Sequence, residues 1–235
     1  MEKKITIIIP CYNEINTIEK IIKKIKKIDI EKQIILVDDN SNDGSRDLIQ
    51  EKLITEIDLF LKHDGNYGKG KCIITAKPFI LNELIIIQDA DLEYNPENYL
   101  DLIEPILDKR TNVVYGSRVL NRENYKKHTS FLSSFRIFGN FVLTKISNLI
   151  NNQNLTDAHT CYKVFTKDVF DKIILKEEGF NFCPEITTKI ANLKEKIEEV
   201  PIDYYGRSKN EGKKIRFWHA IQAVYTLVKY RLIND

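Results

Sequence analysis

Five short apolar runs alternate with stretches long enough for helices in the first half of the chain. The runs occupy residues 5–9, 34–37, 59–61, 84–87 and 113–115. Such alternation predicts βα units and a mostly parallel sheet that helices cover on both faces. In sheets of this kind the ligand crevice lies at the carboxyl ends of the strands, so we expect the functional residues directly after each run.

A polar segment follows each of these runs. The segments are PCYNE at 10–14, DDNSNDGS at 38–45, HDGNYGKGK at 63–71, QDADLE at 88–93 and GSR at 116–118. Asn, Asp, Gly and Ser are also common in turns for conformational reasons, so a single segment would carry little weight. Five such segments at one edge of a sheet indicate a binding or catalytic site.

The βα rhythm ends after residue 120. We predict helices at 131–150, near 184–193 and at 216–232, a strand at 197–204, and a segment of mixed character at 156–165. A chain of 235 residues is within the size that one hydrophobic core can support. We therefore expect a single domain over residues 1–235, with functional halves at 1–118 and 119–235.

The composition excludes several classes of protein. Apolar residues make up 43% and charged residues 30% of the chain, values typical of soluble globular proteins rather than disordered ones. The 4 cysteines are scattered without a CxxC pair, which suggests neither a zinc ribbon nor a disulfide scaffold. The first apolar run is too short for a signal peptide, and no uncharged run reaches about 18 residues, so we expect a cytoplasmic protein.

Three carboxylates, Asp89, Asp91 and Glu93, follow the fourth apolar run with alternate spacing. They would point to one side if the backbone stayed extended beyond the strand. Two unit charges about 4 Å apart at an effective dielectric near 20 repel by roughly 4 kcal/mol, so such a cluster must take up a proton or a cation. Oxygen ligands favour Mg²⁺ or Mn²⁺. The alternative is that these acids are solvated loop residues, with Asp91 capping a helix.

Eight ordered segments resemble the family 2 glycosyltransferases, and most of all the branch of dolichyl-phosphate mannose synthases and their bacterial relatives. The segments span residues 5–222 and read IIIPCYNE, ILVDDNSNDGS, NYGKGK, IIQDADLE, VYGSR, TDAHTCYKVF, GFNFCPEITTKI and YYGRSKNEGKKIRFWHAI. The resemblance implies an α/β protein of the GT-A fold, with a Rossmann-like, mostly parallel central sheet, helices on both faces and C-terminal amphipathic helices. It also implies a nucleotide-sugar-binding half at 1–118 and an acceptor-side half at 119–235.

The resemblance further implies site residues. Nucleotide-sugar contacts are expected at Pro10, Tyr12, Glu14, Val37, Asp39, Lys69, Asp89, Ala90, Asp91, Arg118, Arg207 and Lys213. The metal side is expected at Asp89, Asp91 and Glu93, where Glu93 stands at a position that is often Gln in the family, so its role as a ligand stays open. Arg118, Arg207, Lys213 and Lys214 match phosphate-handling basic residues, although Arg118 could instead pair with a core acid.

The mechanism depends on the acceptor. A sugar hydroxyl needs a general base, whereas a lipid phosphate is already an anion. For a phosphate acceptor, the metal at Asp91 and the guanidinium of Arg118 would stabilise the leaving nucleoside diphosphate while the acceptor attacks C1 with inversion. Asp157 and Glu185 are candidate bases, but either could equally hold the acceptor loop. We expect His159 to make a structural hydrogen bond, and His63 to be a surface or cap residue.

The apolar stripes of the predicted helices at 131–150 and 216–232 suggest a membrane surface. Core packing or a dimer interface is the alternative explanation of such stripes. We expect a hexosyltransferase that lies peripherally on the inner membrane leaflet and acts on a polyprenyl phosphate, with a separate membrane protein as a candidate partner and no nucleic acid. Two other functions stay open: transfer to a saccharide in cell-surface polysaccharide synthesis, and a non-catalytic membrane-associated scaffold.

Overall fold

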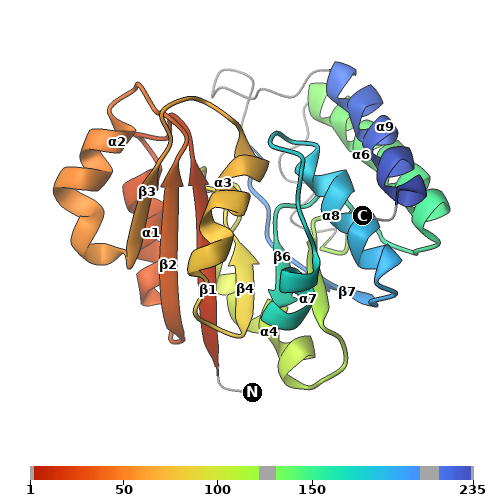
Figure 1. The fold of residues 1–235 in the computed structure, drawn as a ribbon, viewed down its shortest axis with the longest axis horizontal. Coiled ribbons are helices and arrows are strands. Elements are labelled where there is room, and N and C mark those ends of the chain that lie inside the picture. Colours follow the sequence, from red (N-terminus) through yellow and green to blue (C-terminus); the bar gives the residue numbers. More distant parts are fainter. Residues whose placement is uncertain (1–2, 122–130, 207–216, 234–235) are drawn as a thin grey trace.

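The centre of the protein is a seven-stranded sheet with the strand order β3-β2-β1-β4-β6-β5-β7 (Figure 1). The computed structural model describes residues 3–121, 131–206 and 217–233. The strands are β1 Lys4–Cys11, β2 Glu31–Asp38, β3 Leu59–Lys62, β4 Leu84–Ile87, β5 Val113–Ser117, β6 Lys163–Thr166 and β7 Ile197–Pro201. Each apolar run identified in the sequence forms one of these strands, so the predicted alternation is confirmed.

Most neighbouring strands run parallel. β1 lies between β2 and β4 and is parallel to both, β2 is parallel to β3, and β5 is parallel to β7. β6 is antiparallel to its two neighbours, β4 and β5. The sequence did not predict β6. The strand has only 4 residues, KVFT, all of them buried, which is too short a segment to show the alternation of apolar and polar residues that identifies a strand.

Helices cover both faces of the sheet; in Figure 1, α3 lies in front of it and α1 lies behind it. The helices are α1 Ile18–Lys27, α2 Ser45–Leu48, α3 Lys69–Ala76, α4 Tyr99–Leu107, α6 Phe131–Asn151, α7 Lys167–Lys172, α8 Phe182–Asn192 and α9 Phe217–Leu232. Short turns of 3-10 or π helix occupy Ile49–Leu53, Ile54–Glu56, Lys77–Phe79 and Pro96–Asn98. Because both faces are covered, all 4 residues of β4 are buried, which explains why the central runs are apolar at every position.

α6, α8 and α9 pack against one another beside the β5-β6-β7 end of the sheet (Figure 1). The buried face of α9 consists of Ala223, Thr226, Leu227 and Tyr230. The apolar stripe that the sequence indicated for this helix lies on the opposite, outward side, where Ile221, Val228 and Leu232 are exposed. Core packing therefore does not explain that stripe.

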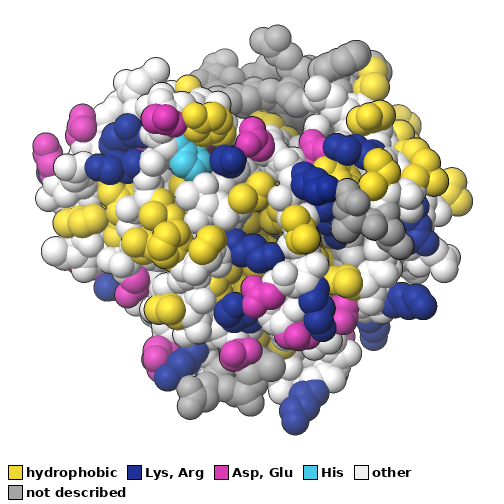
Figure 2. All heavy atoms as spheres, in the orientation of Figure 1, with side chains coloured by type: hydrophobic (Ala, Val, Ile, Leu, Met, Phe, Trp, Pro, Cys, Tyr) yellow, Lys and Arg dark blue, Asp and Glu magenta, His cyan; other side chains and the backbone are white. Residues whose placement is uncertain are grey.

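α6 also buries polar residues and exposes apolar ones. Its buried residues include Thr144, Ser147, Asn148 and Asn151, whereas Phe138, Phe141, Val142 and Leu149 are exposed. Hydrophobic side chains gather over α6 and α9 at the upper right of Figure 2, among Lys and Arg side chains. Within the described residues, neither helix has the length and apolar character needed to cross a bilayer.

Truncation of one buried and one exposed leucine tests this orientation of α9. Leu227 has an exposed fraction of 0% and Leu232 of 79%. We expect Leu227→Ala to lower the free energy of unfolding by about 2–5 kcal/mol, because it leaves a cavity. Leu232→Ala should change it by no more than about 0.5 kcal/mol. Urea unfolding measures both values, and the reverse order would contradict the orientation.

Candidate functional site

The loop after β1 is fastened to the loop after β2. Two hydrogen bonds join Asn13 and Asn42. The side-chain amide of Asn13 donates to Asn42 Oδ1 at 3.0 Å, and the backbone N–H of Asn42 donates to Asn13 Oδ1 at 2.9 Å. The backbone N–H of Glu14 also donates to Ser45 Oγ at 2.8 Å. Asn13 has φ of 57°, in the left-handed region that Asn tolerates better than most residues.

These bonds hold three expected nucleotide-binding residues in place. Pro10, Tyr12 and Glu14 are half-buried beside the strand ends, and Glu14 Oε2 accepts a bond from the Thr17 hydroxyl at 2.7 Å. Val37 lies inside β2 with its side chain fully buried. Only its backbone is therefore suited to contact a ligand.

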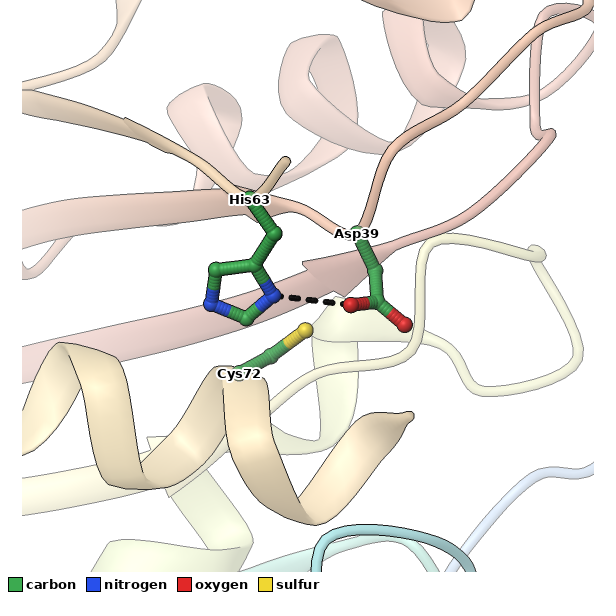
Figure 3. Close-up of side chains that lie close together, drawn as sticks. All are labelled: Asp39, His63 and Cys72. Atoms are coloured by element: carbon green, nitrogen blue, oxygen red, sulfur yellow. Dashed lines mark hydrogen bonds and ion pairs between the residues drawn. The ribbon is translucent and has the colours of Figure 1, made fainter. Parts of the chain in front are cut away.

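Asp39 organises the loop after β3 (Figure 3). Its carboxylate accepts a hydrogen bond from His63 Nδ1 at 2.8 Å, drawn as the dashed line in Figure 3. It also accepts the backbone N–H groups of Tyr67 at 2.9 Å and Gly68 at 2.7 Å. His63 Nε2 accepts the Thr75 hydroxyl at 2.9 Å. The expectation that His63 is a surface or cap residue was wrong, because its ring is buried and links β3 to α3.

Asp39, His63 and Cys72 place one potential ligand atom each within 4.8 Å of one another (Figure 3). Both ring nitrogens of His63 are already hydrogen-bonded. Burial, with the nearby carboxylates of Asp39 and Asp38, raises the pKa of the Cys72 thiol, whereas a metal needs the thiolate. The geometry favours a hydrogen-bond network over a metal site.

Lys69 and Asp89 form an ion pair at the end of β4. Lys69 Nζ lies 2.5 Å from Asp89 Oδ1 and 3.0 Å from Cys161 Sγ. Burial opposes the charge of Asp89, but the Lys69 ammonium outweighs burial and lowers the pKa of Asp89 below its ordinary value. Ala90, the next residue, is buried.

The backbone does not stay extended through Asp89, Asp91 and Glu93, so alternate spacing does not decide how their side chains point. β4 ends at Ile87, and Leu92 has φ of 61°. Glu93 is buried, and its Oε2 accepts the Tyr204 hydroxyl at 2.8 Å. Asp91 is half-buried, and its Oδ1 accepts the backbone N–H of Glu93 at 3.1 Å. The premise of an extended triple was wrong.

Arg118 and Asp157 form a bidentate ion pair at the end of β5. Arg118 Nε lies 2.6 Å from Asp157 Oδ2, and its Nη2 lies 2.8 Å from Oδ1. Asn140 on α6 donates to the same Oδ1 at 3.0 Å. Burial opposes ionisation of Asp157, yet the Arg118 guanidinium lowers its pKa to about 2. Arg118 also lies over the Tyr204 ring, 5.1 Å from its centroid.

Glu185, the second candidate base, is fully buried in α8. Its two oxygens accept the backbone N–H groups of Lys176 at 2.7 Å and Glu177 at 2.9 Å, and Lys189 Nζ lies 3.0 Å from Oε1. Asp157 and Glu185 are both engaged in holding neighbouring segments. Of the two roles that the sequence left open for each, the geometry favours the structural one.

One ring nitrogen of His159 lacks the structural hydrogen bond that we expected within the described residues. Its Nε2 is buried without a partner among the described residues. Burial, followed by the positive charge of Lys163, lowers the pKa of His159 to about 4. Arg207, Lys213 and Lys214 lie outside the described residues, so their phosphate-handling role stays a prediction.

The Arg118–Asp157 pair predicts a pH dependence of stability. Because the pKa of Asp157 falls from about 3.9 in the unfolded chain to about 2 in the folded protein, its ionisation stabilises the fold by about 2–3 kcal/mol above about pH 4. This contribution is lost as the pH falls from about 4 to about 2. We expect Asp157→Asn to lower the free energy of unfolding at pH 7 and the gap to wild type to narrow as the pH falls. Denaturant unfolding at several pH values measures the gap. The exposed-site variant Asp101→Asn is the control, and a gap that stays constant down to about pH 2 would contradict the assignment.

Known glycosyltransferases resemble this chain over most of its length. The UDP-N-acetylglucosamine–dolichyl-phosphate N-acetylglucosaminyltransferase of Methanococcus voltae is 26% identical over 224 residues, which cover 86% of this chain and 85% of the relative. The dolichol-phosphate mannosyltransferase of Pyrococcus furiosus is 26% identical over 237 residues, covering 97% of this chain and 64% of that longer protein.

Solved structures share the fold. Mycobacterium tuberculosis glucosyl-3-phosphoglycerate synthase, crystallised with Mn²⁺, UDP and phosphoglyceric acid, superposes with a TM-score of 0.72 at 15% identity and covers 99% of this chain and 80% of its own. The GT-A fold inferred from the sequence is thereby confirmed. The pattern described as Glycosyl transferase family 2 matches residues 6–174, the greater part of the chain. The protein therefore belongs to glycosyl transferase family 2.

Proposed function

We propose that this family 2 glycosyltransferase passes a hexose from a nucleotide diphosphate sugar to a polyprenyl phosphate, with inversion at C1. The observation that carries the proposal is the outward apolar surface of α6 and α9, which is joined to the ion pairs at the strand ends through Asn140 on α6. Relatives named as dolichyl-phosphate transferases support the acceptor class.

Residues 1–118 form the donor half in this proposal. Pro10, Tyr12, Glu14 and the backbone of Val37 line the ends of β1 and β2, and Asp39 fixes the loop that leads to Lys69. The loops that carry these residues are tied together by short hydrogen bonds. A nucleotide would therefore meet a preformed surface, which lowers the entropic cost of binding.

A divalent cation suits the oxygen groups at the end of β4. Mg²⁺ and Mn²⁺ are commonly held by one or two carboxylates together with substrate phosphates, and Asp89 and Asp91 supply two carboxylates here. When bound, the ion would neutralise charge on the leaving diphosphate. We assign the ion to Asp89 and Asp91, and we assign the buried carboxylate of Glu93 to holding the hydroxyl of Tyr204. Structural neighbours contain Mn²⁺ or Mg²⁺ together with UDP.

We assign Arg118 to the stabilisation of phosphate charge. Its bonds to Asp157 use two of the five N–H donors of a guanidinium, so donors remain for phosphate oxygens. Asp157 is a weak base at a pKa of about 2, which suits an acceptor that is already an anion. The remaining chemistry is positioning and charge stabilisation, and a saccharide acceptor would lack an evident base at Asp157.

The acceptor side rests on residues 119–235. The exposed apolar residues of α6 and α9 form one surface with Lys145 and Arg231, and neither helix contains Asp or Glu. Apolar side chains with basic neighbours suit the interface of a membrane with anionic lipids. We assign this surface to the inner leaflet of the membrane, where a polyprenyl phosphate presents its head group.

Nucleotide binding should depend on a divalent ion. At about 100 times the dissociation constant, UDP or GDP with Mn²⁺ should stabilise the fold by about 2.7 kcal/mol, which raises the melting temperature by roughly 5 °C or more. The variant Asp91→Asn should lose most of the stabilisation that depends on Mn²⁺, and the control variant Asp101→Asn should lose none of it. Thermal unfolding with EDTA, Mn²⁺ and each nucleotide measures the effect. A shift that is equal with EDTA would contradict the metal site, and the absence of any shift would favour the scaffold alternative.

Transfer to a lipid acceptor should depend on the apolar surface. Phe138 is 62% exposed on α6, and Leu81, 77% exposed and outside both helices, provides a matched control. We expect Phe138→Glu to weaken sedimentation with anionic vesicles by about tenfold or more, since it removes an apolar anchor and adds a negative charge. It should lower sugar transfer to vesicle-embedded polyprenyl phosphate in parallel, while Leu81→Glu changes neither.

Two results would contradict this assignment. Equal vesicle binding by Phe138→Glu and wild type would show that another surface meets the lipid. Transfer of labelled sugar to saccharides but not to polyprenyl phosphate would favour the role in polysaccharide synthesis.

A further inference from the structure

The backbone around Lys69 is fixed on two sides. On one side, the Asp39 carboxylate accepts the N–H groups of Tyr67 and Gly68. On the other side, the N–H of Lys71 donates to the carbonyl of Glu178 at 2.9 Å. Lys69 is therefore presented to Asp89 by a clamped segment rather than by a free loop.

The two glycines of the GKG stretch are required by this clamp. Gly68 has φ of 100°, and a Cβ there would lie 2.8 Å from the carbonyl oxygen of Glu178. A Cβ on Gly70 would lie 2.0 Å from the carbonyl oxygen of Glu177. The segment can approach residues 177–179 this closely only because both positions lack side chains.

Lys69 opens α3, where a cation is disfavoured because the N-terminal end of a helix carries partial positive charge. The ion pair with Asp89 offsets this local disadvantage: the ammonium lies 2.5 Å from the carboxylate, and both side chains are largely buried. The segment thus holds a cation at one of the two carboxylates that we assign to the divalent ion.

We propose that Lys69 is a built-in competitor of the divalent ion at Asp89, so that the ion enters the site together with the nucleotide diphosphate rather than before it. The proposal rests on the proposed function and deepens it. A carboxylate that is neutralised by an ammonium attracts a second cation weakly. A diphosphate brings the missing negative charge and offers the lysine, which acts as a point charge, another partner. Ion and nucleotide then strengthen each other's binding by the same factor.

Removal of the lysine charge should separate the two binding events. We expect Lys69→Met to bind Mn²⁺ alone about tenfold more tightly than wild type and to show a smaller gain in Mn²⁺ affinity when UDP or GDP is added. Titration calorimetry and the electron paramagnetic resonance of free Mn²⁺ measure both quantities without turnover. Lys69→Arg keeps the charge and should resemble wild type.

Lys71 supplies a matched control, since it lies two residues further along α3 and pairs with Glu178 at 3.1 Å. Lys71→Met should bind Mn²⁺ as wild type does. If Lys69→Met does not fold, Lys69→Gln gives the same measurement, because it removes the charge and keeps a hydrogen-bond donor for Asp89.

The outcomes distinguish this inference from the proposed function. In one outcome, wild type shows nucleotide-dependent Mn²⁺ binding, but the uncharged Lys69 variants bind Mn²⁺ alone no more tightly than wild type. This result would overturn the inference that Lys69 competes with the ion, and it would leave the proposed metal site intact. If wild type binds no Mn²⁺ with either nucleotide, both the metal site and the competition are overturned.

Discussion

Acids buried at the carboxyl edge of the sheet need partners, and this requirement shapes the site. An ionised carboxylate is costly to bury unless a cation or hydrogen-bond donors compensate its charge. Four acids here are paired with residues from other segments: Asp38 with Arg46, Asp39 with His63, Asp89 with Lys69 and Asp157 with Arg118. The pairs of Asp39, Asp89 and Asp157 each join two segments that carry expected site residues. The loops are therefore ordered by the same charges that make the edge suitable for phosphates and a metal ion.

The partners of these acids also explain how several carboxylates can lie at one edge of the sheet without strong mutual repulsion. The sequence suggested that a cluster of three carboxylates must take up a proton or a cation, whereas in the structure each of the three carboxylates has a hydrogen-bond or ion-pair partner of its own. The ammonium of Lys69 compensates the charge of Asp89, and the carboxylate of Glu93 accepts the hydroxyl of Tyr204. Arg118 is oriented by Asp157 and by the ring of Tyr204. A diphosphate that enters this edge meets oriented cations, so little reorganisation is needed to stabilise its charge.

The sequence predicted the elements better than the contacts. Apolar runs and the polar segments after them identified the central strands and the site edge, because burial on both faces leaves a strong local signal. β6 left no such signal, since it is short and its antiparallel pairing depends on distant strands. The role of His63 depends on Asp39 and Thr75, which neighbour it only in the fold. The turn at Leu92 likewise could not be read from the alternate spacing of Asp89, Asp91 and Glu93.

Which face of an amphipathic helix is buried depends on whether its polar residues find hydrogen-bond partners inside the protein. Two buried asparagines of α6 have internal partners: Asn148 exchanges hydrogen bonds with the backbone of Leu155 at 2.8 and 2.9 Å, and the Asn151 side-chain nitrogen donates to Thr188, while Asn151 Oδ1 is buried without a partner among the described residues. Polar groups that are hydrogen-bonded, as in Asn148, can be buried at little cost. The apolar stripe is then left outward, while Asn140 on the same helix reaches Asp157 and, through it, Arg118. α6 therefore belongs both to the exposed surface and to the ion-paired site, which links the proposed lipid contact to the arginine that we propose binds phosphate.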